Sequence, residues 1–224
     1  MNLLELYKIL FSSFGEQHWW PASSGRNKEF EICVGAILTQ NTSWSNVEKA
    51  IHNLKKEKLL FLEALSKAEK KKIAELIKPA LYFNQKAEYL QNFCRHIEKN
   101  YSGNLKEFFE KPSQELRKEL LSIKGIGFET ADSICLYAAQ KPIFVIDAYT
   151  KRIISRAMGE KEKSYSELQE FFQKELPKNK QLYNEFHALL VCLGKNSCKK
   201  KNPLCSNCPI NQKCVFANTH TAGK

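Results

Sequence analysis

Four cysteines crowd into the segment CKKKNPLCSNCPINQKC near the end of the chain. Cys198, Cys205, Cys208 and Cys214 are separated by six, two and five residues, so one 17-residue loop could surround a single compact centre. Structural zinc prefers two separated CxxC pairs, whereas a [4Fe-4S] cube accepts four thiolates that arrive unevenly from one loop. Because the only CxxC pair joins Cys205 to Cys208, the spacing favours a [4Fe-4S] cluster, with zinc as the alternative. A centre saturated by protein ligands is expected to fold the loop rather than to do chemistry.

The other four cysteines lie singly in apolar stretches. A secreted disulfide scaffold would be much shorter than 224 residues, and in a reducing compartment disulfides are disfavoured. We expect these residues to be buried core thiols. They are Cys33, Cys94, Cys135 and Cys192.

A second motif, LLSIKGIGFETA, has the form of two helices joined by a tight turn that contains Lys124, Gly125 and Gly127. Glycines permit backbone conformations closed to other residues, and without side chains the peptide N–H groups can approach a phosphate. The motif predicts a turn that grips DNA.

A carboxylate candidate follows 18 residues after Glu129. Asp147 stands in PIFVIDAYTKRI, between an extended apolar segment and a predicted helix. Aspartate is a favoured helix N-cap, and many such residues do nothing else. A capping carboxylate can nevertheless face a cleft, and Asp147 is then a catalytic candidate.

The charge balance favours a polyanionic partner. The chain has 35 Lys and Arg against 24 Asp and Glu, a net charge of +11. Cations that neutralise phosphates release condensed counterions, so nucleic acid is the leading partner class. A basic surface that serves solubility is the alternative.

The elements that must position these residues are helices. Apolar residues recur at helical spacing throughout, and only PIFVI, residues 142–146, has a strand-like pattern, so the fold class is all-α. No apolar run approaches the roughly 20 residues that cross a bilayer, and no leader is evident, so we expect a cytoplasmic protein without membrane partners. Helices are predicted over 1–14, 30–40, 46–56, 71–80, 85–99, 113–123, 129–140, 148–158, 166–176 and 181–195.

The hairpin, then VIDAYTKRI, then FHALLVCLGKNSC leading into the cysteine loop, together with GAILTQNTSW, resembles the endonuclease III superfamily of helix-hairpin-helix DNA glycosylases. The resemblance covers most of residues 30–214. It implies two helical lobes: one of residues 25–138, and a second of residues 1–24 with 139–224 that carries the cluster loop 198–214. A damaged nucleotide would be turned out of double-stranded DNA into a pocket between the lobes.

Glu129 decides the expected type of glycosylase. In bifunctional members of the superfamily, the matching position is a lysine whose amine forms a Schiff base with the sugar. A carboxylate cannot form that imine, so strand cleavage by this route is not expected. Monofunctional hydrolysis remains, in which Asp147 stabilises the cationic sugar and positions or deprotonates water. This chemistry suits N-alkylated purines such as 3-methyladenine, because alkylation weakens the glycosidic bond.

The three tryptophans favour the same substrate class, since indole faces attract electron-poor cationic bases. The combination of WWP, LTQNTSW and an acid after the hairpin resembles the 3-methyladenine DNA glycosylase III branch. That resemblance implies that Gln40 fills the gap left in the DNA helix. Core packing is the alternative for the tryptophans, and a surface position is the alternative for Glu129. The implied base pocket consists of Trp19, Trp20, Pro21, Trp44 and Glu129.

Glycosylases of other specificities also lack the lysine. A thymine-mismatch glycosylase stays open, whereas an adenine-mismatch enzyme usually has a further domain for which we expect no room after Cys214. A non-catalytic DNA-binding module is a third possibility, against which the retained Asp147 argues. We expect a monomer, nucleoid-associated if bacterial, whose abasic product passes to an AP endonuclease.

Overall fold

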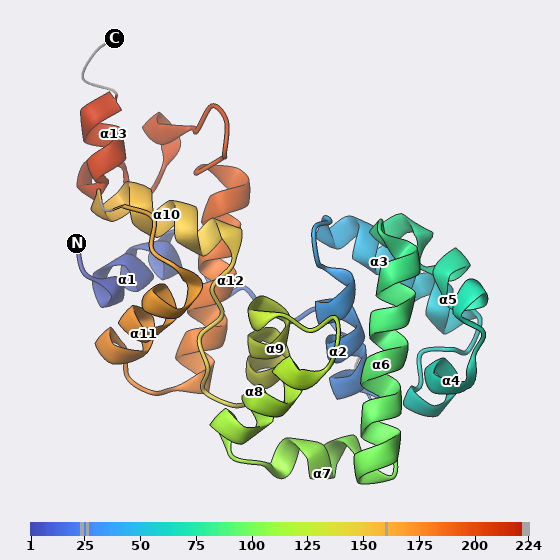
Figure 1. Ribbon diagram of the computed structural model, residues 1–224. Helices are drawn as coiled ribbons and strands as arrows, with labels where there is room; N and C mark the ends of the chain where they lie inside the picture. Colours follow the sequence, from blue (N-terminus) through green and yellow to red (C-terminus); the bar gives the residue numbers. More distant parts are fainter. Residues whose placement is uncertain (23–24, 26, 160, 221–224) are drawn as a thin grey trace. The chain divides into compact units, whose positions relative to one another are not determined.

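The computed structural model describes residues 1–22, 25, 27–159 and 161–220, which form helices and loops without a β-strand (Figure 1). The predicted all-α class is thereby confirmed. The chain divides into two compact units, Trp20–Lys141 and Met1–Trp19 with Pro142–Lys224. The expected division after residue 24 involves a residue outside the described part. No helix in the described residues is long and apolar enough to cross a membrane.

The unit Trp20–Lys141 is built around α2, whose side chains from Phe30 to Leu38 are all buried. This helix packs against α3, α6, α9 and η2, while α6 also packs against α4, α5 and α7. The apolar sequence of α2 explains its central place, because a helix that is apolar on all sides needs partners all round. The helices are α2 (Lys28–Leu38), α3 (Trp44–Lys56), α4 (Leu62–Lys67), α5 (Lys70–Leu76), η1 (Lys78–Ala80), α6 (Phe83–Tyr101), α7 (Leu105–Glu110), α8 (Ser113–Ser122), α9 (Phe128–Ser133) and η2 (Ile134–Ala138).

A buried lysine joins two of these helix ends. Lys86 Nζ donates to the carbonyl oxygens of Leu38, at 2.9 Å, and Ala80, at 2.6 Å. Both acceptors belong to the last residue of a helix, where carbonyl groups lack partners within the helix. Burial lowers the pKa of Lys86 to about 8, because the charged ammonium has lost most of its water.

The second unit packs α1 against α12, and α10 against both α12 and α13. Its core is aromatic: the rings of Phe144 and Phe172 stack with centroids 4.1 Å apart, and Tyr183 and Phe186 meet Phe144 edge-on. The helices are α1 (Leu3–Phe14), α10 (Ala148–Met158), α11 (Tyr165–Glu175), α12 (Lys180–Asn196), η3 (Cys205–Asn207), η4 (Asn211–Lys213) and α13 (Val215–His220).

The strand-like segment 142–146 is extended and largely buried, and side chains of α11 take the place of a partner strand. The Phe144 N–H donates to Gln173, and Gln169 Nε2 donates to the Phe144 carbonyl. The Ile146 N–H donates to the Tyr165 hydroxyl. The three α11 residues are four apart, so they share one face of the helix. The segment therefore enters α10 along a fixed path.

Several expectations differ from the structure. The predicted helix 129–140 consists of α9 followed by a π-helical turn, η2. The short helices α4, α7 and α13 were not predicted, because six residues are too few for a clear apolar period. Three of the isolated cysteines are buried as expected, but Cys192 is only partly buried, and its sulfur accepts a hydrogen bond from Asn196.

Candidate active site

Asp147 is the N-cap of α10 and is nevertheless buried. Its Oδ1 accepts from the Thr150 N–H at 2.7 Å, which fixes the carboxylate at the start of the helix. Its Oδ2 lies 3.6 Å from Nε2 of His187 on α12, within ion-pair distance of a protonated imidazole. Burial raises the pKa of Asp147, but the nearby His187 and the Thr150 N–H outweigh it and hold the pKa below its ordinary value.

The predicted hairpin is formed by α8, a turn and α9. Gly125 has a φ of +100°, and a Cβ there would lie 2.1 Å from the ring of Tyr89 on α6. Glycine is therefore required for its conformation and for the close approach of that ring. Gly127 differs from the expectation, because its φ is −92° and a Cβ would meet nothing within 4 Å. Only the first glycine occupies a conformation that other residues avoid.

Neighbouring side chains hold the turn in place. Gln40 Nε2 donates to the Gly125 carbonyl at 2.9 Å and to the Thr130 hydroxyl at 3.2 Å. Lys124 Nζ, which is exposed, lies 2.7 Å from Glu88 on α6. The turn is thus fixed both from the segment that follows α2 and from α6.

A buried ion pair joins the two hairpin helices. Arg117 of α8 donates from Nε and Nη2 to the two carboxylate oxygens of Asp132, at 2.6 and 3.1 Å. Asp132 is fully buried, and the Arg117 guanidinium also lies 5.3 Å from the ring centroid of Phe128. Two-point pairing of this kind fixes the angle between α8 and α9.

Glu129 occupies the first turn of α9, where a negative charge suits the helix dipole, and its side chain is exposed.

Two of the predicted pocket tryptophans meet in one unit. The rings of Trp20 and Trp44 are 5.0 Å apart at an interplanar angle of 88°, and Tyr137 lies 5.2 Å from Trp20 on its π-helical turn. A Cβ at Gly35 would approach Trp20 to 2.9 Å, so the missing side chain makes room for the indole. Trp44 Nε1 donates to Glu48 at 2.8 Å. These contacts form a fixed aromatic cluster.

The other two predicted pocket residues are Trp19 and Pro21. Trp19 falls in the unit that contains Asp147, and Lys195 Nζ lies 5.9 Å from its ring centroid. Pro21 is exposed. The pair Trp19 and Trp20 thus spans the division between the two units.

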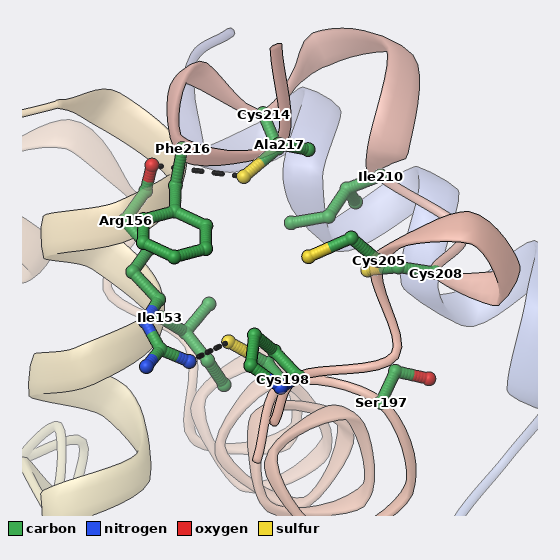
Figure 2. Close-up of a pocket in the computed structure, with 11 residues that line it drawn as sticks. Ile153, Arg156, Ser197, Cys198, Cys205, Cys208, Ile210, Cys214, Phe216 and Ala217 are labelled. Atoms are coloured by element: carbon green, nitrogen blue, oxygen red, sulfur yellow. Dashed lines mark hydrogen bonds between the residues drawn. The ribbon is translucent and has the colours of Figure 1, made fainter. Parts of the chain in front are cut away.

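The four crowded cysteines line one pocket, which Figure 2 shows with α10 on its opposite side. All four are free thiols, and mostly apolar residues, together with Arg156 and Ser197, complete the wall. Burial, and to a smaller extent the neighbouring cysteines, raises the pKa of Cys208 to about 11. In the described part of the chain, no three His, Cys, Asp or Glu side chains converge closely enough to hold a single metal ion. The apolar wall residues include Ile153, Ile210, Phe216 and Ala217.

Two arginines of α10 bind the cysteine loop. Arg156 Nη1 donates to Cys198 Sγ at 3.4 Å and to the Lys199 carbonyl at 2.7 Å, and Cys214 Sγ donates to the Arg156 carbonyl at 3.6 Å (Figure 2). Arg152 Nε donates to the Cys198 carbonyl at 2.9 Å. One helix therefore carries Asp147 at its start and supports the loop one to two turns later.

Sequence reasoning missed several of these residues. His187 lies in the quoted segment FHALLVCLGKNSC, but a single histidine in an apolar helix gives no sign of its partner. Tyr137 lies within a π-helical turn, which helical periodicity does not reveal. Arg152 and Arg156 were readable only as a basic pair four residues apart, which is also common on exposed helix faces.

The described geometry can be compared with known proteins. Residues 34–178 match the HhH-GPD superfamily of base excision DNA repair proteins. A protein named as a candidate DNA repair glycosylase from Methanocaldococcus jannaschii is 49% identical over 95% of this chain and 96% of its own length. The structure of 3-methyladenine DNA glycosylase from H. pylori, bound to 1,N6-ethenoadenine, has a TM-score of 0.76 and 30% identity, covering 87% of this chain and 98% of its own. An endonuclease III–DNA complex has a TM-score of 0.81 at 20% identity, covers 99% of both chains, and shows the shared fold.

Proposed function

The chain belongs to the HhH-GPD superfamily and is a base excision repair DNA glycosylase, and on that premise we propose that it hydrolyses N-alkylated purines without cutting the strand. The proposed substrate is double-stranded DNA that contains a base such as 3-methyladenine. The products are the free base and an abasic site, which an AP endonuclease would process.

The observation that carries this proposal is Glu129, which stands where bifunctional relatives are expected to have the attacking lysine. A carboxylate offers no amine for a Schiff base. The lysine of the hairpin, Lys124, is paired with Glu88 at 2.7 Å and is itself proposed to contact DNA. Hydrolysis is then the remaining route, and it needs a base that leaves readily.

The aromatic cluster supports the proposal that the substrate base is a cationic purine. Because Trp20 and Trp44 are perpendicular, a planar base can stack on the face of only one of them and meets the other edge-on. The Glu48 carboxylate that accepts from the Trp44 indole adds negative charge near a positively charged base. The 30% identical relative bound to 1,N6-ethenoadenine supports a purine-sized pocket, to which Trp19 and Pro21 are also proposed to contribute.

Asp147 is the proposed catalytic residue. Loss of the base leaves positive charge on the sugar, which a carboxylate stabilises, and the same group can position or deprotonate the attacking water. Its lowered pKa supports this role, because the group is ionised at neutral pH despite its burial.

DNA contact is proposed for the hairpin and its neighbours. The exposed Gly127 leaves the turn backbone open to a phosphate, Gly125 gives the turn its positive φ, and Lys124 adds an exposed charge next to it. Gln40, which donates a hydrogen bond to the Gly125 carbonyl, is proposed to fill the space of the displaced nucleotide. The net charge of +11 also favours DNA as the partner, because it attracts the negatively charged phosphates.

A [4Fe-4S] cluster is the proposed cofactor of the cysteine pocket. Four free thiols line one pocket, and their uneven spacing with a single CxxC pair suits a [4Fe-4S] cluster better than zinc. Bound there, the cluster would hold the loop folded rather than act on the substrate. A brown protein with absorption near 400 nm is expected; a colourless protein that contains zinc would contradict this assignment. The ligands would be Cys198, Cys205, Cys208 and Cys214.

The decisive test compares the wild-type protein with Asp147→Asn on methylated DNA. The wild type should release 3-methyladenine, and the variant should bind the same DNA but release almost none. Equal release by both proteins would remove Asp147 from the mechanism. Release of thymine from G·T mismatches, with none from methylated DNA, would replace the alkylpurine proposal by the mismatch alternative.

A further inference from the structure

The chain contains only two aspartates, Asp132 and Asp147, and both are buried next to a basic side chain. Asp132 has Arg117, which is always charged. Asp147 instead has His187, whose charge depends on pH. The use of a histidine beside the candidate catalytic carboxylate calls for an explanation that helix capping does not supply.

The two oxygens of Asp147 have different surroundings. Oδ1 accepts from the Thr150 N–H at 2.7 Å, so it performs the capping role. Oδ2 faces His187 Nε2 at 3.6 Å. Both side chains come from helices that pack against each other, α10 and α12, and both residues are less than 9% exposed. The imidazole thus lies next to Oδ2, the carboxylate oxygen that does not cap the helix.

We propose that His187 is a positioning residue for Asp147: its imidazole fixes the rotation of the carboxylate and supplies the positive charge that keeps this buried carboxylate ionised. The catalytic consequence rests on the proposed function. A neutral carboxyl group could neither stabilise a cationic sugar nor accept a proton from water. Desolvation works against ionisation at this site, and His187, 3.6 Å away, is the basic side chain that opposes it.

The other groups around the carboxylate do not replace His187. On α10, Thr150 contributes its N–H, which is a neutral donor. On α11, Tyr165 accepts from the Ile146 N–H and so acts on the backbone before Asp147. The helix α13 also packs on α10, and its residues 215–219 include no charged side chain.

The test uses the scarcity of aspartate. Protein labelled with ¹³C at the aspartate carboxyl group should give two side-chain signals, and Asp147→Asn identifies one of them. In His187→Gln, which keeps an amide donor but loses the charge, the titration midpoint of Asp147 should rise by about one pH unit or more. The Asp132 signal should not move. His96→Gln, which removes a histidine paired with Glu119 in the other unit, is the matched control and should leave both midpoints unchanged.

The same variant should move the acid limb of base release. Under single-turnover conditions, the limb in His187→Gln should shift to higher pH by the amount that the carboxyl signal shifts, while affinity for methylated DNA stays the same. An unchanged Asp147 midpoint in folded His187→Gln would overturn the proposal. A raised titration midpoint of Asp147 without a shift in the pH dependence of base release would overturn the link to catalysis.

A second measurement covers the case in which the variant does not fold. In the wild-type protein, the His187 ring signals should inflect at the Asp147 midpoint, because the two side chains lie 3.6 Å apart. The absence of this inflection would contradict the pairing. Because these signals need no turnover, a wild-type protein inactive on alkylated DNA would refute the proposed function without deciding the role of His187.

Discussion

Gly35→Ala should damage the aromatic cluster through a single methyl group. The added Cβ would lie 2.9 Å from Cζ2 of Trp20. Carbon atoms prefer a separation of about 3.5–4.0 Å, so the indole must retreat by roughly 0.6 Å or more. Misplacement of about 1 Å near reacting groups can cost about 100-fold in rate, so we expect base release to fall about tenfold.

Stability should change much less than activity. Alanine favours the helix by about 0.5–1 kcal/mol over glycine, whereas overpacking costs about 1–3 kcal/mol. The net loss should therefore be about 1 kcal/mol, which lowers the Tm by about 3 °C in a chain of this size.

The assay is single-turnover release of 3-methyladenine, with tryptophan fluorescence as the report on Trp20. Trp20→Phe provides the control, because it removes much of the indole that Gly35→Ala displaces. In that background the added methyl should cost little further activity. If Gly35→Ala costs the same in both backgrounds, or leaves activity and fluorescence unchanged, the packing argument is wrong.

Three further predictions concern the supporting structure. Arg156→Gln removes the hydrogen-bond donor to Cys198 Sγ, so the cluster absorption near 400 nm should be lost about tenfold faster in air than in the wild type. Equal rates of loss would contradict a role of Arg156 in holding the cluster. Burial lowers the pKa of Lys86 from 10.5 to about 8, so the unfolded chain binds more protons than the folded one between these two pH values. In urea denaturation, the free energy of unfolding of the wild type should therefore rise with pH relative to that of Lys86→Met. If the two proteins show the same dependence on pH, the lowered pKa is refuted. Arg117→Ala leaves Asp132 buried without its cation and should cost about 3–5 kcal/mol by urea denaturation, whereas a loss below about 1 kcal/mol would show that the pair is dispensable.

Long helices were predictable because their apolar residues repeat over several turns. The predicted range 148–158 coincides with α10, and α12 differs from its predicted range by one residue at each end. The six-residue helices α4, α7 and α13 were not predicted, because fewer than two turns give no clear apolar period. The extended segment 142–146 was recognised, but the α11 side chains that hold it could not be foreseen, since a sequence does not reveal which helix face will meet it.

The candidate site was predictable in its parts. Spacing alone brought the four cysteines together as one set, and the structure places them around one pocket. The roles of Asp147, Glu129 and the tryptophans remain predictions. The proximity of His187 to Asp147 and of Gly35 to Trp20 depends on how helices pack, and such contacts between distant residues leave no local signal in one sequence.

The most direct test counts free base and broken strands in one reaction. A duplex with a single 3-methyladenine is incubated with the protein and split between borohydride trapping, direct strand analysis and hot alkali. We expect stoichiometric release of the base, intact strands until alkali is added, and no trapped covalent complex. Strands cut without alkali, together with a borohydride-trapped protein–DNA complex, would show that a lysine attacks the sugar and would contradict the role assigned to Glu129.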